Sequence, residues 1–301
     1  MSEELLEPDA TDAAGSRAMP GSLYVVATPL GHARDVTLRA LDILRTTDII
    51  AAEDTRRTLP LLRRYGIATK PISLHAHNEA QRATSIVAAL SAGKSVTIVT
   101  DAGTPAISDP GARVVRSVHD AGYPVVPIPG PSAVAAAVSA GGLEADRFLF
   151  LGFLPPTRNA RRNLLQSVEA LPFALVVYEA PHRVRATVDD LAEVLGVRTL
   201  VVARELTKVF ETIARLPLAN AGAWFDADPN RERGEFVLIV DAPSPDDERA
   251  PALAADVDRW LAELVRELPP ARAARVVANV TGVARDRLYA RALLLKGNPE
   301  R

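Results

Sequence analysis

The clearest candidate for chemistry is a loop of small residues, DAGTPAISDPG at 101–111, which follows the apolar run Ser95–Thr100. Asp101 supplies a carboxylate, Gly103 lets a ligand approach the backbone closely, and Pro105 stiffens the loop. Turns and ligand-binding loops use the same residue types, so the residues alone leave both explanations of Asp101 equally open.

Asp109 lies in the same loop and has a purely structural explanation. It is followed by Pro110 and Gly111 and then by a helical pattern. An aspartate before a proline is typical of an N-cap at a helix start. The sequence therefore predicts that Asp109 caps the next helix and has no other role.

Two more loops of small residues follow apolar runs, TPLG at 28–31 and PIPGPSA at 127–133. Loops after parallel strands meet at the carboxyl edge of a sheet, where open α/β folds bind ligands. We expect the three loops to converge on a site for a flat, adenosine-like ligand. None of them has the G-x-G-x-x-G pattern of dinucleotide-binding loops, which argues against a nucleotide-dependent oxidoreductase.

His75, His77 and His182 are the residues that could suggest a metal site. No H-E-x-x-H pattern is present, and no third ligand stands at a recognisable spacing. The chain has no cysteine, which excludes disulfides, thiolate catalysis and cysteine-ligated metals. We expect loop histidines with satisfied hydrogen bonds, or a substrate contact, and no metal.

A cluster of arginines, Arg158, Arg161 and Arg162, lies in the polar stretch PPTRNARRN. Arginines beside a cleft can bind phosphates. A short run of charged residues, however, is more often the solvent-exposed face of a helix. The run RELTK at 204–208, with Glu211, contains both acidic and basic residues. A turn held by salt bridges therefore explains it as readily as a catalytic role does.

The net charge is −2, but acidic and basic residues are unevenly distributed along the chain. Residues 1–12 carry five acids and no base, whereas residues 270–301 carry seven Lys/Arg against two acids. Such a basic tail favours contact with a polyanion. The arginines that would supply phosphate contacts there are Arg272, Arg275, Arg285, Arg287 and Arg291.

The elements that position these residues alternate in two series. Strand-length apolar runs span 23–27, 48–52, 71–74, 95–100 and 124–128, and helical patterns span 37–45, 55–65, 79–92 and 111–121. A second series has strands near 147–151, 173–178, 199–203, 209–214 and 235–240, and helices near 159–170, 182–195 and 217–226. Such alternation predicts an α/β protein of two lobes, with a parallel sheet and then a mixed sheet.

The predicted organisation has five parts. We expect a disordered leader at 1–20, an α/β lobe at 21–130, a second at 131–241, a linker at 242–251 and a helical RNA-binding module at 252–301. The break Thr281–Val283 in the module resembles a helix-turn-helix. No apolar stretch reaches about 18 residues and no signal peptide is evident, so we expect a cytoplasmic protein without a membrane partner.

Eight motifs in this order resemble those of the tetrapyrrole methylase-like superfamily, and within it the ribosomal RNA small subunit methyltransferase I family. They are TPLG at 28–31, AAEDTR at 51–56, DAGTPAISDPG at 101–111, PIPGPSA at 127–133, GFLP at 152–155, YEAPHR at 178–183, ARELTKVFET at 203–212 and RGEFVLIV at 233–240. The likeness covers residues 22–240 in register. It implies methylation of the ribose 2′-oxygen of cytidine 1402 in 16S rRNA, with S-adenosylmethionine as donor and no metal.

The resemblance also implies where the donor binds. It assigns to the donor site Pro29, Leu30, Asp101, Gly103, Thr104, Ser132, Ala133, Leu206 and the backbone near Glu235. His32 departs from the family pattern, which usually has Asn there, and Ala76 stands where Asp is common. The TPLG loop and the His75–Asn78 segment are therefore weaker specificity determinants than the Asp101 loop.

Methyl transfer to a hydroxyl needs a base for the proton or a cation for the developing charge. Lys208 is the candidate to stabilise the oxygen, and Glu53, Asp54 and Glu211 are candidates for the base. The resemblance further implies a homodimer and a substrate in the assembled small subunit or a late precursor.

Two alternatives remain open from the sequence. One is a methylase of the same fold that acts on a corrin, a porphyrin or a modified histidine; the arginine-rich loop and the basic module weigh against it. The other is a non-catalytic RNA-binding factor of ribosome assembly. The intact Asp101, Gly103 and Pro105 weigh against that second alternative.

Overall fold

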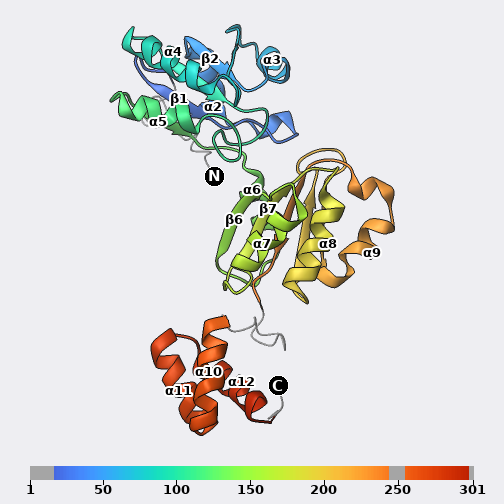
Figure 1. The fold of residues 1–301 in the computed structure, drawn as a ribbon. Helices are drawn as coiled ribbons and strands as arrows, with labels where there is room; N and C mark the ends of the chain where they lie inside the picture. The colour runs from blue at the N-terminus through green and yellow to red at the C-terminus, as the bar shows by residue number, and fades with distance from the viewer. Residues whose placement is uncertain (1–16, 244–254, 298–301) are drawn as a thin grey trace, which may run out of the picture.

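The computed structural model describes residues 17–243 and 255–297. Within these ranges the chain forms two α/β lobes, each built on its own sheet, and a bundle of helices at the C-terminal end (Figure 1). No helix in the described ranges is both long and apolar enough to cross a membrane. The predicted linker 242–251 lies almost entirely outside the described residues.

The first lobe is a parallel sheet, as predicted, with the strand order β3-β2-β4-β1-β5. Its strands are β1 (Leu23–Val26), β2 (Ile49–Ala52), β3 (Ile72–Ser73), β4 (Val96–Val99) and β5 (Val125–Ile128). Its helices are α2 (Leu38–Thr46), α3 (Thr55–Arg64), α4 (Glu79–Ser91) and α5 (Ala112–Asp120). All five strands point their carboxyl ends to one edge, where the loops of small residues follow.

Successive side chains of these strands point to opposite faces of the sheet, so the core of the first lobe consists of two layers. Leu23 of β1 packs with α4 and α5, whereas the next residue, Tyr24, packs with α2 and α3. Both layers are apolar because a parallel sheet is covered by helices on its two faces. The helices thereby fix the strand ends that carry the loops.

The second lobe is a mixed sheet with the order β6-β7-β10-β8-β9, in which β6 and β7 are parallel and β10 runs antiparallel to its neighbours. Its strands are β6 (Phe148–Phe153), β7 (Ala174–Glu179), β8 (Thr199–Arg204), β9 (Thr212–Pro217) and β10 (Phe236–Val240). Its helices are α6 (Ala133–Ala140), α7 (Arg158–Val168), α8 (Val184–Leu195) and α9 (Ala221–Asp226).

The two faces of the second sheet are covered unequally. Helices α7, α8 and α9 bury one face, and Phe225 of α9 is fully buried there. On the other face α6 packs Val134 and Ala137 on the sheet, and Leu30 of the first lobe lies beside them. The part of this face that α6 does not cover is turned toward the first lobe.

Two predicted elements need correction. Helix α6 was not predicted, and it covers the second sheet immediately after the PIPGPSA loop. The strand predicted at 209–214 begins instead at Thr212, because residues 205–211 form a loop in which Glu205 and Thr207 have positive φ.

The end of the predicted leader is ordered where the structure describes it. Ala18 is buried and donates its N–H to the Thr46 hydroxyl at 2.9 Å, and Met19 donates to the Tyr24 hydroxyl at 2.8 Å. The prediction of disorder is therefore wrong for these residues, and its remaining part, 1–16, lies outside the described ranges.

The C-terminal module consists of α10 (Ala255–Glu267), α11 (Pro270–Thr281) and α12 (Arg285–Gly297), which pack on a shared apolar core (Figure 1). Gly282 ends α11 in the left-handed conformation, with φ 72°, where a glycine is favoured. The turn between α11 and α12 therefore falls where the sequence predicts a helix-turn-helix break.

Candidate functional site

A cavity of about 400 Å³ lies between the carboxyl edge of the first sheet and the uncovered face of the second. Three loops of the first lobe meet there. The backbones of Thr28 and Gly103 exchange hydrogen bonds of 2.9 and 3.0 Å, and the Thr104 hydroxyl donates to the Pro131 carbonyl at 3.0 Å. The loops after β1, β4 and β5 thus form one wall, as their positions after parallel strands predict.

The structure brings most of the predicted donor-site residues to this cavity. Those that line it are Leu30, Asp101, Gly103, Thr104, Ser132, Ala133, Leu206 and Glu235. Pro29 is not among the lining residues, although it precedes Leu30 directly. Their role in binding the donor stays a prediction, now with a common location.

The opposite wall comes from the second lobe and is mainly apolar. Ala203 and Val237 belong to the sheet face that α6 leaves open, and Tyr178 and Phe153 extend the wall from β7 and β6. The Phe153 and Tyr178 rings meet edge to face, 5.6 Å apart, and Phe153 is 53% exposed. These two aromatic residues belong to the GFLP and YEAPHR motifs, but no role for either is predicted from the sequence.

Among the residues that the structure describes, four other than glycine have positive φ, and all four lie in loops of this cavity region. Ala106 and Ser108 follow β4, whereas Glu205 and Thr207 follow β8. Such conformations cost of order 1 kcal/mol each and cluster at functional sites. The two loops are also held close to the opposite lobe: a Cβ on Gly152 would lie 3.0 Å from Ser108 Oγ, and one on Gly31 would overlap Lys208.

Glu53 and Asp101 form an acidic corner of the cavity and bind the backbone. Glu53 Oε2 accepts from the Thr100 hydroxyl at 2.6 Å and from the Asp101 N–H at 3.3 Å. Asp101 Oδ1 accepts from the Asp54 N–H at 3.0 Å. Burial and the charge of Glu53 raise the pKa of Asp101, against the effect of that backbone hydrogen bond. Both carboxylates thus tie the ends of β2 and β4 together.

Lys208 lines the cavity between two carboxylates. Its Nζ lies 2.9 Å from Glu205 Oε1 and 2.8 Å from Glu235 Oε2. Burial favours the neutral amine, but the hydrogen bonds and charges of Glu235 and Glu205 outweigh it and raise the pKa of Lys208. The side chain is therefore a cation and not a base.

Two of the candidate bases lie away from the cavity. Asp54 caps α3 by accepting from the Arg56 N–H at 2.8 Å, and hydrogen bonds from Arg56 lower the pKa of Asp54 to about 2. Glu211 is exposed and accepts from the Thr207 N–H at 2.5 Å. Neither belongs to the described residues that line the cavity, so a role for either as base stays a prediction without support from the cavity.

Contrary to the prediction from the sequence, Asp109 is not the N-cap of the helix that follows it. The N-cap of α5 is Gly111 and makes no side-chain cap. Glu79 instead performs the capping, since its Oε1 accepts from the N–H groups of Gly111 and Arg113 at 2.9 Å each. Asp109 lines the cavity, so the N-cap assignment is wrong and the residue becomes a functional candidate.

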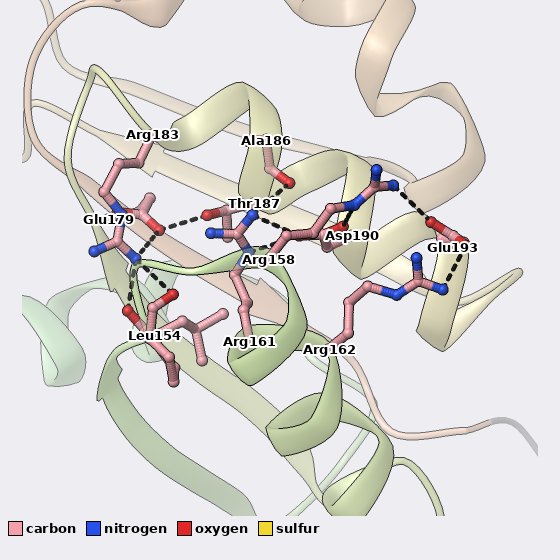
Figure 2. Close-up of polar contacts among 11 residues, drawn as sticks. Leu154, Arg158, Arg161, Arg162, Glu179, Arg183, Ala186, Thr187, Asp190 and Glu193 are labelled. Atoms are coloured by element: carbon pink, nitrogen blue, oxygen red, sulfur yellow. Dashed lines mark hydrogen bonds and ion pairs between the residues drawn. The ribbon is translucent and has the colours of Figure 1, made fainter.

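The arginines of the PPTRNARRN stretch are ion-paired within the second lobe (Figure 2). The Arg161 side chain is 4% exposed and pairs with Asp190, whose side chain is 1% exposed, at 2.5 Å. Arg158 bonds to Asp190 and Glu193, and Arg162 to Glu193. The prediction that Arg161 contacts RNA is wrong for this structure, because its guanidinium is buried against α8.

The YEAPHR motif forms a second internal network in the same region (Figure 2). Buried Glu179 accepts from the Thr187 hydroxyl at 2.6 Å and pairs with Arg183 at 3.2 Å. Arg183 also donates to the Leu154 carbonyl of the GFLP motif at 2.6 Å. These charges fix the ends of β6 and β7, and with them the positions of Phe153 and Tyr178.

The predicted RNA contacts of the C-terminal module fall into two groups. Arg272, Arg275 and Arg285 are exposed. Arg291 is instead bound to Asp258 of α10, at 2.7 and 2.8 Å, and joins α12 to α10. Arg287 is half-buried. The exposed three are the ones positioned to meet a polyanion.

The histidine segment holds no recognisable metal site. His75 and His77 lie edge to face, 5.9 Å apart. In the ranges 17–243 and 255–297, no group of three or more His, Asp or Glu is arranged to hold a metal ion.

The cavity suits the sulfonium donor that the resemblance implies. Its volume of about 400 Å³ falls within the usual range of small-molecule sites, and its walls are mostly apolar. At Gly103 a Cβ would stand 3.3 Å from Leu30 and 3.8 Å from the Pro131 carbonyl, so the glycine allows the three loops to approach one another. Asp101 and Glu235 supply negative charge that suits a cation.

The family profile described as "Tetrapyrrole (Corrin/Porphyrin) Methylases" matches residues 22–222, and the profile "RsmI C-terminal HTH domain" matches residues 251–296. The chain is 46% identical to a protein of Escherichia coli O157:H7 named "Ribosomal RNA small subunit methyltransferase I", over 92% of this chain and 96% of that protein. It is 44% identical to a protein of that name from Pseudomonas aeruginosa, over 92% and 98%.

Solved structures agree in fold. A diphthine synthase superposes with a TM-score of 0.58 at 14% identity, over 73% of this chain and 90% of that one. The methyltransferase CobJ gives a TM-score of 0.56 at 20% identity, over 74% and 94%. At these identities the likeness concerns the arrangement of the two lobes alone.

Proposed function

This chain belongs to the ribosomal RNA small subunit methyltransferase I family, and on that premise we propose that it transfers a methyl group from S-adenosylmethionine to ribosomal RNA of the small subunit. The observation that carries the proposal is the convergence of Leu30, Thr104 and Ser132 on one cavity with Leu206 of the other lobe. When bound, S-adenosylmethionine supplies an electrophilic methyl group on a cationic sulfur.

The residues of the cavity contribute mainly by position. The loops at Gly103 and Ser132 and the side chains of Leu30 and Leu206 hold the donor between the lobes. Holding donor and acceptor in line at near-attack distance removes a large part of the barrier. Lys208 is the cation of the second wall, and its position in the cavity supports a role in stabilising negative charge on the acceptor oxygen.

The position of the methyl group is a further part of the proposal. The motif likeness supports the ribose 2′-oxygen of cytidine 1402 in 16S rRNA. Mass spectrometry of 16S rRNA fragments from cells with and without the gene tests it. We expect one fragment to lose the mass of a methyl group on its ribose in the deletion strain. An unchanged fragment pattern would contradict the rRNA assignment, and a loss at another nucleotide would contradict the site.

The C-terminal module is proposed to bind RNA phosphates through Arg272, Arg275 and Arg285. Replacing all three by alanine should weaken RNA binding uniformly across sequences. The slope of log K against log salt should become shallower by about 2, because each phosphate contact on single-stranded RNA contributes about 0.7. Fluorescence anisotropy with a labelled RNA fragment at several salt concentrations measures this slope.

Arg259 and Arg266 of α10 provide the control for this experiment. They lie on the same module, but each is paired with an acid one turn away, Asp256 at 3.2 Å and Glu263 at 3.1 Å. Their double alanine variant should keep the slope of the intact chain. Equal slopes for the triple variant and the intact chain would show that these three arginines do not contact RNA.

We further propose that the chain forms a homodimer and acts in the cytoplasm. A homodimer is supported by the motif likeness, and the exposed Val209 and Phe210 of the loop before β9 offer apolar surface for such an interface. A sedimentation mass of a single chain at micromolar concentration would contradict it. A ribosomal RNA substrate also supports a cytoplasmic location, which fractionation of cells expressing a tagged chain can test.

A further inference from the structure

Asp109 is a carboxylate of the cavity to which neither the sequence nor the resemblance assigns a chemical role. It follows the strained residues Ala106 and Ser108 and faces the space between the lobes. The Thr100 hydroxyl acts to lower the pKa of Asp109, and burial, followed by the negative charge of Asp109, raises the pKa of Tyr178 on the opposite wall. The side chain therefore stands between the acidic corner of the first lobe and the aromatic wall of the second.

The other acids of the cavity are occupied. Glu53 and Asp101 accept from backbone N–H groups, as described above. Glu179 is paired with Arg183, and Glu235 with Lys208. Asp109 is different, because its described partner is a hydroxyl that already donates to Glu53. It is the lining carboxylate best able to take up a new proton.

Phe153 is the exposed aromatic residue of the lining, and its ring meets Tyr178 edge to face. Exposed aromatic rings of this kind stack on unpaired RNA bases. A nucleotide stacked on Phe153 would share one cavity with Asp109 and with the loops at Gly103 and Ser132, where the donor is proposed to lie.

We propose that Asp109 is the base that removes the proton from the acceptor hydroxyl during methyl transfer. The inference deepens the proposed function and rests on it. In this step the acceptor oxygen forms a bond to the methyl carbon. The carbon–sulfur bond breaks with its electron pair on sulfur, and the hydroxyl proton passes to a carboxylate oxygen of Asp109. Solvent then takes the proton.

The surroundings of Asp109 bring the pKa of its carboxyl close to neutral pH. Burial, followed by the negative charge of Glu53, raises the pKa of Asp109 to about 6. Asp101 and Glu235 act in the same direction, and the Thr100 hydroxyl acts against it. The cations of the lining, Arg57 and Lys208, are directed to Asp101 and to the Glu205–Glu235 pair. A base is most efficient when its pKa lies near the working pH.

If Asp109 is the base, kcat/KM is expected to fall at low pH. Asp109 must be ionised to accept a proton, so kcat/KM should fall tenfold per pH unit below about 6 and level off above it. Asp109→Asn should lower kcat by about 100- to 1000-fold and remove this limb of the profile. Asp109→Glu should recover part of the rate. Asp120→Asn, at the exposed end of the following helix, is the matched control and should behave as the intact chain.

Two measurements separate this role from others. Calorimetry should give Asp109→Asn the donor affinity of the intact chain, and a carbon-13 NMR titration of the free protein should lose one carboxyl titrating near pH 6. A donor affinity weakened tenfold or more would overturn the proposal by making Asp109 a donor ligand. Turnover equal to that of the intact chain would overturn it while leaving the proposed function standing. An intact chain that methylates no small-subunit RNA would overturn both.

Discussion

Replacing Asp190 by leucine is expected to lower the free energy of unfolding of the second lobe by about 3–5 kcal/mol. The substitution leaves the Arg161 guanidinium, 4% exposed, without its buried carboxylate. An uncompensated buried charge is costly because the surrounding protein solvates it poorly. Urea unfolding followed by the fluorescence of Trp224, in a Trp260→Phe background, reports on this lobe.

Two further variants decide whether burial is the cause. Glu193→Leu removes an acid of the same helix whose side chain is 47% exposed, and it should change the stability by less than about 1 kcal/mol. The double variant Arg161→Met/Asp190→Leu should recover most of the loss, since no charge is left buried. If Asp190→Leu were as stable as Glu193→Leu, the pair would not be buried in solution, and Arg161 would again be available to RNA.

The ion pair of Arg161 is a contact that could not be predicted from the sequence. A run of three arginines matches a phosphate-binding cluster, yet the partner that neutralises it lies 29 residues further along the chain. Only the packing of α7 on α8 brings Asp190 to Arg161. Asp109 is the opposite case, because a local N-cap signal explained it fully while Glu79, 32 residues away from Gly111, does the capping.

The fold was more accessible to prediction than these contacts. Strands of the first lobe lie within two residues of the predicted runs, because buried parallel strands are continuously apolar. Helix α6, AVAAAVSA, was missed since it lacks a polar face and so shows no helical period. The start of β9 was misplaced because Val209 and Phe210 look like strand residues but are 92% and 70% exposed.

The loops of the cavity were predictable for a topological reason. Each follows a strand of one parallel sheet, so the chain must bring them to the same edge. The wall contributed by the second lobe depends on how the two sheets face each other, which no local pattern encodes. Tyr178 and Phe153 therefore emerged only from the structure, although both lie in motifs of the resemblance.

Gly103→Ala is expected to weaken donor binding by about 10-fold, measured by calorimetry with S-adenosylmethionine, because overpacking of this size costs about 1–3 kcal/mol. Gly103 has φ +82°, and an added Cβ would stand 3.3 Å from Leu30. The added methyl group must therefore push the end of the Leu30 side chain, which lines the cavity, aside by a few tenths of an ångström, in addition to straining the backbone. Because the same glycine is bound to Thr28 through both backbone groups, the loop has little freedom to move away.

Gly122→Ala separates the two effects. Gly122 has nearly the same conformation, φ +79°, but nothing lies within 4 Å of its added Cβ. Both variants should lose about 1–2 kcal/mol of stability to backbone strain, whereas only Gly103→Ala should lose donor affinity. Equal affinities for the two variants would mean that the contact of Gly103 with Leu30 does not shape the donor site. Since that contact joins the loops after β1 and β4, such a result would remove the physical basis for placing the donor between them.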